Sequence, residues 1–153
     1  MDKVLVAVDG SDRSIEAAHR AANMLEEKDV EITVITVMQE ATGTVYDVPH
    51  GTTSAMTTET MEKLREEQEE MAKEKGERIV KKAATFYREL GMDVKEVIRF
   101  GSPADIICDY ADTNDMDMIV LADKGHGGVK RYLLGSISDK VVRHANTSVL
   151  VIK

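Results

Sequence analysis

The chain lacks the features that would place it outside the cell or in a membrane. It contains one cysteine among 153 residues, and no apolar run approaches the roughly 20 residues that cross a bilayer. Cys108 has no partner for a disulfide within the chain, which is consistent with a reducing compartment. The apolar stretch near the N-terminus is too short and wrongly flanked for a signal peptide. We therefore expect a cytoplasmic protein that does not engage a membrane.

The chain also lacks an excess of positive charge, because 28 acidic residues outnumber 20 lysine and arginine residues. The formal net charge is −8, which argues against a broad surface for nucleic acid or for anionic lipid. Only a local basic cluster is expected, formed by Lys124, Lys130 and Arg131. We accordingly predict no nucleic-acid partner.

Glycine, in contrast, is concentrated in one segment between Leu121 and Ser138, which reads LADKGHGGVKRYLLGSIS. Gly125, Gly127 and Gly128 lie within four positions, and a further glycine, Gly135, is followed directly by a serine. Glycine allows a backbone to approach a ligand closely, and free N–H groups beside a helix start attract anions. The segment therefore predicts a phosphate-binding site.

Short apolar runs rich in valine and isoleucine alternate with longer segments of helical periodicity. Strands are expected at Val4–Val8, Ile32–Val37, Val94–Ile98, Met118–Leu121 and Val149–Ile152. Several of these runs are almost continuously apolar, as in parallel strands covered on both faces. Alternation of strand and helix predicts an α/β fold with a doubly wound parallel sheet. We interpret residues 1–153 as a single domain.

Helix starts are indicated by capping patterns. Ser102 and Pro103 predict the start of one helix, with Asp105 at the capping-box position, and Ser136 with Asp139 repeats the pattern before the last helix. A long helix is expected to begin near residue 58. Its mixed charges at residues 62–82 suggest a solvated face, and Cys108 is expected to pack in the core.

Residues 40–58 are rich in threonine and glycine and predict a flexible loop. Tyr46, Asp47 and His50 give this loop polar groups that could cover a ligand. An unstructured insertion is the more common explanation of such a composition.

In an open parallel sheet, ligands bind at the carboxyl ends of the strands. The first strand is followed by Asp9, the third by Gly101 and Ser102, and the fourth by the glycine-rich segment. Asp9 could bind ribose hydroxyls or help hold a metal, or it could simply cap the first helix. The four histidines have no metal-site spacing.

Three segments together carry a resemblance to a known family. The opening VLVAVDGSDRSIEAA, the central VIRFGSPADII, and GHGGVKRYLLGSIS followed by VVRHANTSVLVIK resemble the universal stress protein family over essentially the whole chain. The resemblance implies a five-stranded sheet of order 3-2-1-4-5, as in the adenine nucleotide alpha hydrolase-like fold. It also implies a homodimer formed through Val149–Ile152 and, in the nucleotide-binding branch, ATP as the ligand.

Carried onto this sequence, the resemblance implies a set of nucleotide-binding residues. Ala7 and Asp9 would contact the adenosine, with Val37 near the base. Gly125, Gly135 and Ser136 match the family's Gly-x2-Gly-x9-Gly-Ser/Thr motif from its second glycine onward. The remaining implied contacts to the phosphates come from Lys124, His126, Gly128, Ile137 and Ser138. Mg²⁺ or Mn²⁺ would be held mainly through the phosphates, with no metal site of the protein's own.

The chain departs from that motif at its first glycine, where Ala122 stands. If this position needs a positive φ, the methyl group costs about 1 kcal/mol, and if it needs close approach, the methyl group crowds the ligand. Asp123 adds a carboxylate that would repel phosphates unless a cation intervenes.

The leading hypothesis is an ATP-binding regulatory protein of the stress-response type, with slow or absent hydrolysis, because no arginine finger or general base is evident. The alternative is a dimeric interaction module that binds no nucleotide. An adenine nucleotide hydrolase and a phospho-acceptor receiver domain with Asp9 as acceptor are further, weaker alternatives. The sequence identifies no regulatory protein partner.

Overall fold

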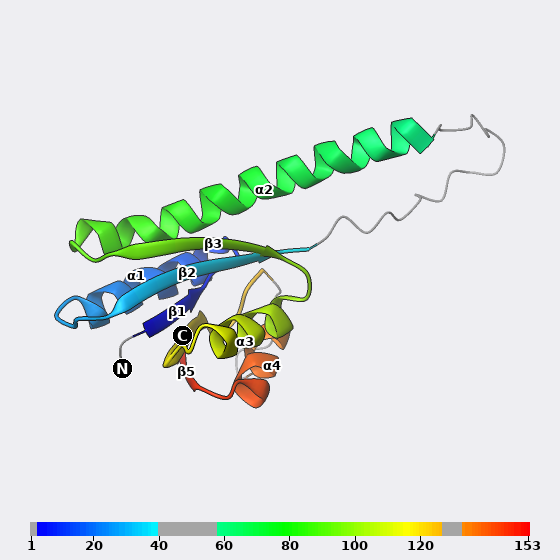
Figure 1. Ribbon diagram of the computed structural model, residues 1–153. Coiled ribbons are helices and arrows are strands. Elements are labelled where there is room, and N and C mark those ends of the chain that lie inside the picture. The colour runs from blue at the N-terminus through cyan, green and yellow to red at the C-terminus, as the bar shows by residue number, and fades with distance from the viewer. Residues whose placement is uncertain (1–2, 40–57, 127–132) are drawn as a thin grey trace.

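Five parallel strands form one sheet in the order β3-β2-β1-β4-β5 in the computed structural model (Figure 1). The structure describes residues 3–39, 58–126 and 133–153. The strands are β1 (Lys3–Ala7), β2 (Glu31–Met38), β3 (Val94–Phe100), β4 (Met118–Ala122) and β5 (Ser148–Ile152). The predicted fold class and strand order are confirmed, and the predicted strands differ from the observed ones only at their ends.

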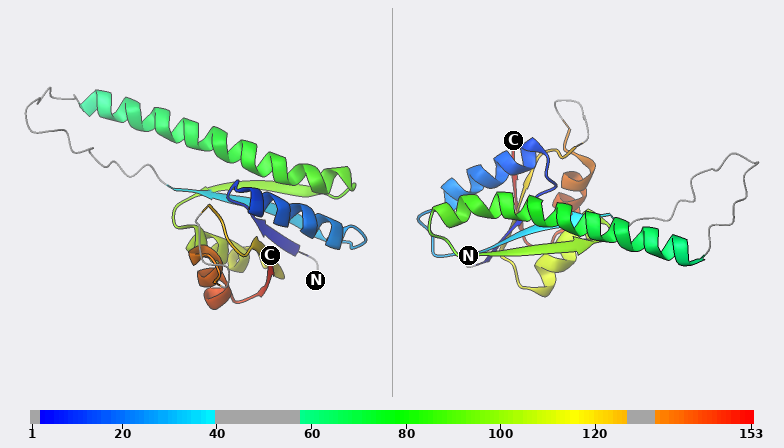
Figure 2. Two further views of the ribbon diagram at one scale, coloured as in Figure 1. Left: turned by 180° about the vertical axis from the view of Figure 1, so that it is seen from behind. Right: turned by 90° about the horizontal axis from the view of Figure 1, so that it is seen from above.

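Two pairs of helices cover the two faces of the sheet (Figures 1 and 2). Helices α1 (Asp12–Leu25) and α2 (Thr58–Glu89) pack on one face, and α3 (Pro103–Thr113) and α4 (Ser136–His144) pack on the other. Successive residues of β1 point to opposite faces: Val4 and Val6 join the core under α1 and α2, whereas Leu5 joins the core under α3 and α4. Burial on both faces explains why the strand reads as a continuous apolar run.

The helix starts differ in detail from the capping patterns. Ser11 caps α1, with its hydroxyl oxygen 3.2 Å from the Ser14 N–H that donates to it. Ser102 does take the N-cap position of α3 before Pro103, but its side chain makes no capping hydrogen bond. The cap of α4 is Gly135, so the prediction that Ser136 is the N-cap is wrong.

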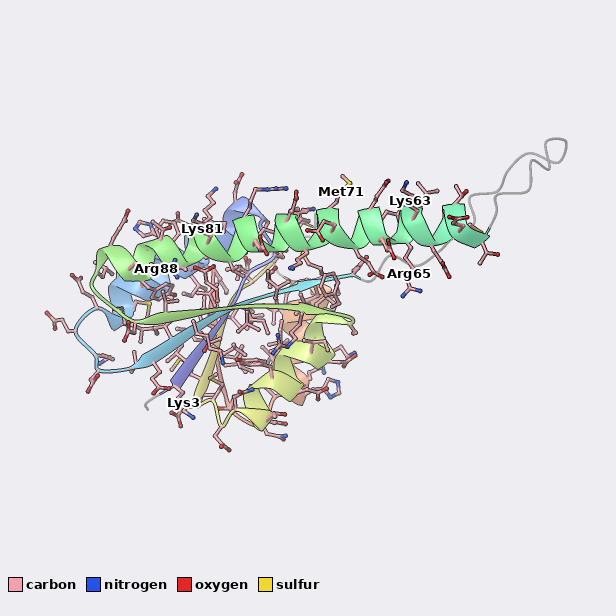
Figure 3. All side chains as sticks on the ribbon, turned by 45° about the horizontal axis from the view of Figure 1, so that its top comes forward. Lys3, Lys63, Arg65, Met71, Lys81 and Arg88 are labelled. Atoms are coloured by element: carbon pink, nitrogen blue, oxygen red, sulfur yellow. The ribbon has the colours of Figure 1, made fainter. Side chains whose placement is uncertain are left out.

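Helix α2 has two unlike halves. Its C-terminal half packs on the sheet and on α1 through a line of buried residues: Gly76, Val80, Ala83, Ala84 and Tyr87. The Tyr87 hydroxyl donates to the Ala18 carbonyl across 3.0 Å. The N-terminal half projects beyond the sheet, and side chains such as Lys63, Arg65 and Met71 stand out from it (Figure 3). Every residue from 58 to 71 is exposed, so the solvated charged face is confirmed for this half.

Three further predictions concern Cys108, the loop after β2 and membrane-spanning segments. Cys108 is buried in the core under α3, as expected. The loop predicted at residues 40–58 lies outside the described residues except for Thr58, which is the first residue of α2. No helix among the described residues is long and apolar enough to span a membrane.

Candidate functional site

A cleft opens at the carboxyl ends of β1, β2 and β4 and consists of two chambers. The first, which we call the apolar chamber, is lined mainly by aliphatic side chains from the strands, α3 and α4. The second, the polar chamber, has a volume of about 480 Å³ and is lined in part by Thr36, Lys75, His126 and Ser136. Asp9, Val37, Gly125 and Ile137 are among the residues that line both chambers, so the two are continuous.

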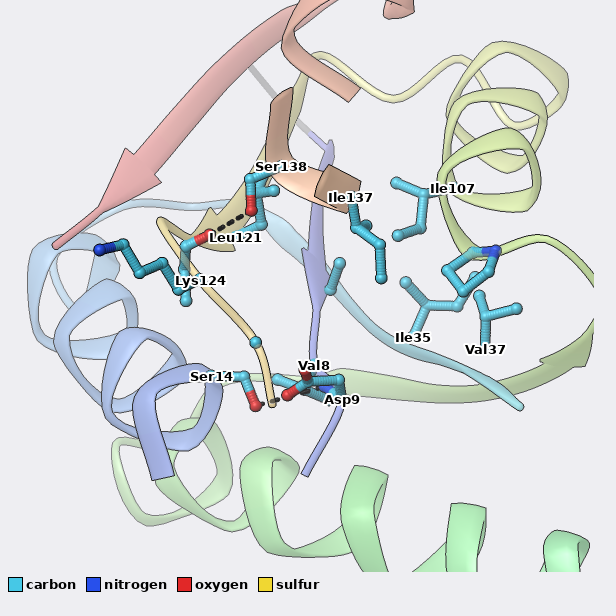
Figure 4. Close-up of a pocket in the computed structure, with 14 residues that line it drawn as sticks. Val8, Asp9, Ser14, Ile35, Val37, Ile107, Leu121, Lys124, Ile137 and Ser138 are labelled. Carbon is cyan, nitrogen blue, oxygen red and sulfur yellow. Dashed lines mark hydrogen bonds between the residues drawn. The ribbon is translucent and has the colours of Figure 1, made fainter. Parts of the chain in front are cut away.

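The apolar chamber is built from residues that also belong to the core. Ile35 and Val37 lie near the end of β2, Ile107 comes from α3, and Leu121 lies near the end of β4 (Figure 4). Ile137, on the first turn of α4, closes the chamber from the other side. Such a narrow apolar space suits a flat, uncharged group better than a charged one.

Asp9 is held in place at the junction of the chambers. Its Oδ1 atom accepts hydrogen bonds from the Ser11 N–H at 2.9 Å and from the Ser11 hydroxyl at 2.6 Å. Burial alone would raise the pKa of Asp9, but the hydrogen bonds from Ser11 and Ser14 and the charge of His126 lower it below its usual range. Asp9 is therefore an ionised acceptor with a fixed orientation at neutral pH.

Gly125 lies directly against this carboxylate. A Cβ atom at position 125 would lie 2.1 Å from the Asp9 Oδ2 atom, so only glycine fits here without movement of Asp9. The next residue, His126, brings its Nδ1 atom within 3.2 Å of the same Oδ2 atom. The glycine loop and the turn after β1 thus meet at Asp9.

The start of α4 forms one wall of the polar chamber. The Gly135 N–H donates to the Asp123 carbonyl across 2.8 Å, and a Cβ atom at position 135 would lie 3.3 Å from the Lys124 Cα atom. Glycine at position 135 is therefore favoured by the close approach of the Lys124 backbone rather than by a positive φ. The first N–H groups of a helix have no partner within it, so Ser136 and Ile137 present donors to this chamber.

Two of the predicted contact residues, Ser138 and Ala122, also have structural roles. The Ser138 hydroxyl is buried and donates to the Ala122 carbonyl across 2.8 Å, which ties α4 to the end of β4 (Figure 4). Ala122 is a buried strand residue, and Asp115 is the only non-glycine residue with a positive φ among those described. The concern that Ala122 needs a positive φ is therefore wrong.

The charged residues of the glycine loop also differ from expectation. Asp123 forms an ion pair with Arg13 of α1 at 2.9 Å and lines neither chamber, so its carboxylate is paired and lies outside the cleft lining. Whether it repels phosphates stays a prediction. Lys124 lines the apolar chamber, but its side chain runs away from Asp9 and Ile137 toward the end of β5 (Figure 4).

The structure therefore brings most of the predicted residues to one cleft: Ala7, Asp9, Val37, Ala122, Lys124, Gly125, His126, Gly135, Ser136, Ile137 and Ser138. Gly128, Lys130 and Arg131 lie outside the described residues. Sequence reasoning missed Thr36 and Lys75. The signals were a threonine in an otherwise apolar strand end and a lysine beside Gly76, a glycine inside a helix.

Thr36 is notable because its hydroxyl is buried without a hydrogen-bond partner among the described residues, and because the residue lines the polar chamber. A buried polar atom usually has a hydrogen-bond partner.

The described part of the chain contains no group of three or more histidine, cysteine or acidic side chains placed to hold a metal ion.

The chain matches one family model over residues 1–153, that of the universal stress protein family. Universal stress protein MJ0531 of Methanocaldococcus jannaschii is 32% identical over 151 residues, covering 99% of this chain and 81% of that protein. Universal stress protein YxiE of Bacillus subtilis is 30% identical over 159 residues, covering 99% of each.

Solved structures share the fold. Hypothetical protein MJ0577 superposes with a TM-score of 0.79 at 22% identity, covering 99% of this chain and 95% of that one. A universal stress protein family protein from Arabidopsis thaliana with AMP bound gives 0.65 at 23% identity, covering 100% and 92%. A universal stress protein in complex with cAMP gives 0.65 at 22% identity, covering 99% and 95%.

Proposed function

The chain belongs to the universal stress protein family, and we propose that it binds ATP in its two-chambered cleft as a nucleotide-dependent regulatory module of the stress response. The observation that carries this proposal is the continuity of an apolar chamber with a polar one at Asp9 and Gly125. A nucleotide has the same division into a flat base, a ribose and a charged tail. Structural neighbours with AMP and with cAMP bound support an adenine nucleotide in particular.

The apolar chamber would take the adenine. Ile35, Val37 and Ile107 offer it an aliphatic lining, and Ala7 lies at the end of β1 beside them. Asp9 would accept hydrogen bonds from the ribose hydroxyls, because its carboxylate is ionised and its orientation is fixed by Ser11. A neutral or rotating side chain at this position would bind the ribose less well.

The polar chamber would take the phosphates. The first turn of α4 presents the N–H groups of Ser136 and Ile137 to it, and the exposed Ser136 adds a hydroxyl. Mg²⁺ or Mn²⁺ would enter with ATP, held mainly through the phosphate oxygens. Among the described lining residues Asp9 is the only carboxylate, which agrees with a cation brought by the nucleotide.

Slow or absent hydrolysis forms part of the proposal. A general base acts best when its pKa lies near the working pH. The lowered pKa of Asp9 makes it a weak base, and its Oδ1 atom is already engaged by Ser11. This arrangement supports binding rather than turnover.

The test is to purify the protein, extract it with acid and separate the released nucleotides, then measure thermal unfolding with and without Mg-ATP. Saturation at 100 times the dissociation constant stabilises a protein by about 2.7 kcal/mol, so a clear rise in melting temperature is expected. Absence of bound nucleotide together with an unchanged melting temperature at millimolar Mg-ATP would refute the proposal.

We further propose a homodimer formed through β5. Among the described strands β5 pairs only with β4, and its residues Val149, Leu150 and Val151 are half-buried. An edge strand with partly exposed apolar side chains favours pairing with a second copy. Light scattering at micromolar concentration should give the mass of a dimer, and the mass of a monomer would contradict this assignment.

A further inference from the structure

Helix α2 is anchored beside the mouth of the cleft by close contacts at two glycines. A Cβ atom on Gly10, in the turn after Asp9, would lie 2.8 Å from the Ile79 Cδ1 atom, so Ile79 packs directly on that turn. Gly76 lies one helical turn away, where a Cβ atom would be 3.0 Å from the Ile98 Cγ2 atom. The two glycines allow α2 to approach the ends of β1, β2 and β3 closely.

These anchors place Lys75 at the polar chamber. Lys75 and Ile79 are four residues apart and therefore share one face of the helix, and both line the polar chamber. Because Ile79 is fixed against Gly10, the Lys75 backbone is held one turn away, about 6 Å along the helix axis. The position of this lysine is set by packing, although its side chain is exposed.

The charged side chains around the cleft show which of them could attract a phosphate group in the polar chamber. Asp9 contributes a negative charge that opposes phosphate binding. Lys124 directs its side chain away from Asp9 and Ile137, and Arg13 is engaged by Asp123 outside both chambers. His126 lies 3.2 Å from Asp9 and is charged only when protonated. Of the described residues that line the polar chamber, Lys75 is the only lysine or arginine, and so the only one with a permanent positive charge.

We propose that Lys75 is a specificity-determining residue, which selects nucleotides with a polyphosphate tail over the corresponding monophosphates. The proposal rests on the nucleotide-binding function proposed above. The apolar chamber and Asp9 would contribute equally to the binding of AMP and of ATP, because both nucleotides carry adenine and ribose. Only a longer tail extends into the polar chamber toward α2, where the ammonium group donates a charge-assisted hydrogen bond to a phosphate oxygen.

The experiment measures the dissociation constants of ATP and AMP by calorimetry for the wild-type protein, Lys75→Gln and Lys73→Gln. Lys73 is the matched control, because it lies on the same exposed stretch of α2, carries the same charge and lines neither chamber. We expect Lys75→Gln to weaken ATP binding about tenfold, the scale of one charge-assisted hydrogen bond. AMP binding should change less than about twofold, and Lys73→Gln should leave both constants within that range.

The outcomes separate this inference from the function on which it rests. Wild-type protein that binds neither nucleotide would refute the proposed function. If the wild-type protein binds nucleotide but Lys75→Gln weakens ATP and AMP binding equally, or weakens neither, the role of Lys75 is refuted and the proposed function is not. If Lys75→Gln and Lys73→Gln weaken ATP binding equally, general electrostatic attraction explains the preference for ATP, and the inference is likewise overturned. Lys75→Arg should restore most of the ATP affinity.

Discussion

The two chambers of the cleft differ in how firmly the fold determines them. The apolar chamber is lined by Ile35, Ile107 and Leu121, which are buried and belong to the core. The polar chamber is bordered by exposed residues such as Lys75, His126 and Ser136, which come from three separate segments. The apolar chamber is therefore constrained by folding itself, whereas the exposed lining of the polar chamber can vary with little cost to stability. Differences between family members in ligand preference are expected in the polar chamber.

The largest effect is expected at the residue where the chambers meet. Gly125→Ala places a methyl group against the Asp9 carboxylate, so both chambers should be disturbed. Affinity for ATP and for AMP should fall by about a hundredfold or more, which corresponds to about 2.8 kcal/mol. Calorimetry measures both constants.

Gly91→Ala is the control for that substitution. Its φ is +75° and a Cβ atom there meets nothing within 4 Å, so the variant should lose about 1 kcal/mol of stability without loss of binding. Unchanged nucleotide affinity in Gly125→Ala would contradict the claim that a side chain at position 125 disturbs Asp9 and both chambers.

A charge in the apolar chamber should affect both nucleotides equally. Ala7→Asp puts a carboxylate at the end of β1, on a half-buried position that lines the apolar chamber and not the polar one, where burial of an unpaired charge is unfavourable. We expect about a tenfold loss for AMP and for ATP alike, in contrast to Lys75→Gln. Val142→Asp, on an exposed position of α4, serves as the control. A loss confined to ATP would show that the two chambers are wrongly assigned.

Ser11→Ala tests how Asp9 is held. The variant removes the cap of α1 and the hydroxyl bond to Asp9, so unfolding in urea should show a loss of about 1 kcal/mol at pH 7. The pKa of Asp9 is lowered in the folded protein, so ionised Asp9 stabilises the fold above its ordinary value of 3.8, and this stabilisation is lost as the pH falls below that value. The difference between wild type and variant should shrink below about pH 4. A difference independent of pH would mean that Ser11 acts only as a cap.

The smallest effect is expected at Ala122. Ala122→Gly restores the glycine that the family motif carries, but Ala122 is a buried residue at the end of β4 without a positive φ. Stability should fall by about 0.5–1 kcal/mol, the usual cost of glycine within a strand, while ATP affinity changes less than about twofold. Tighter binding would show that the alanine crowds the ligand.

The sequence predicted the fold better than the site, for physical reasons. Burial on both faces gave β1, β4 and β5 continuous apolar runs, and the glycines at 125 and 135 indicated close approach of backbone. Local sequence carries no information on contacts between distant elements. The pair of Arg13 with Asp123, the bond of Ser138 to Ala122 and the placement of Lys75 by Gly76 and Ile79 all depend on such contacts.

The most direct test of the central claim is a crystal structure of the protein grown with ATP and Mg²⁺. We expect adenine density between Val37 and Ile107, with the phosphates beside Gly135 and the start of α4. Nucleotide density elsewhere on the surface, or none at saturating concentration, would contradict the assignment of the cleft.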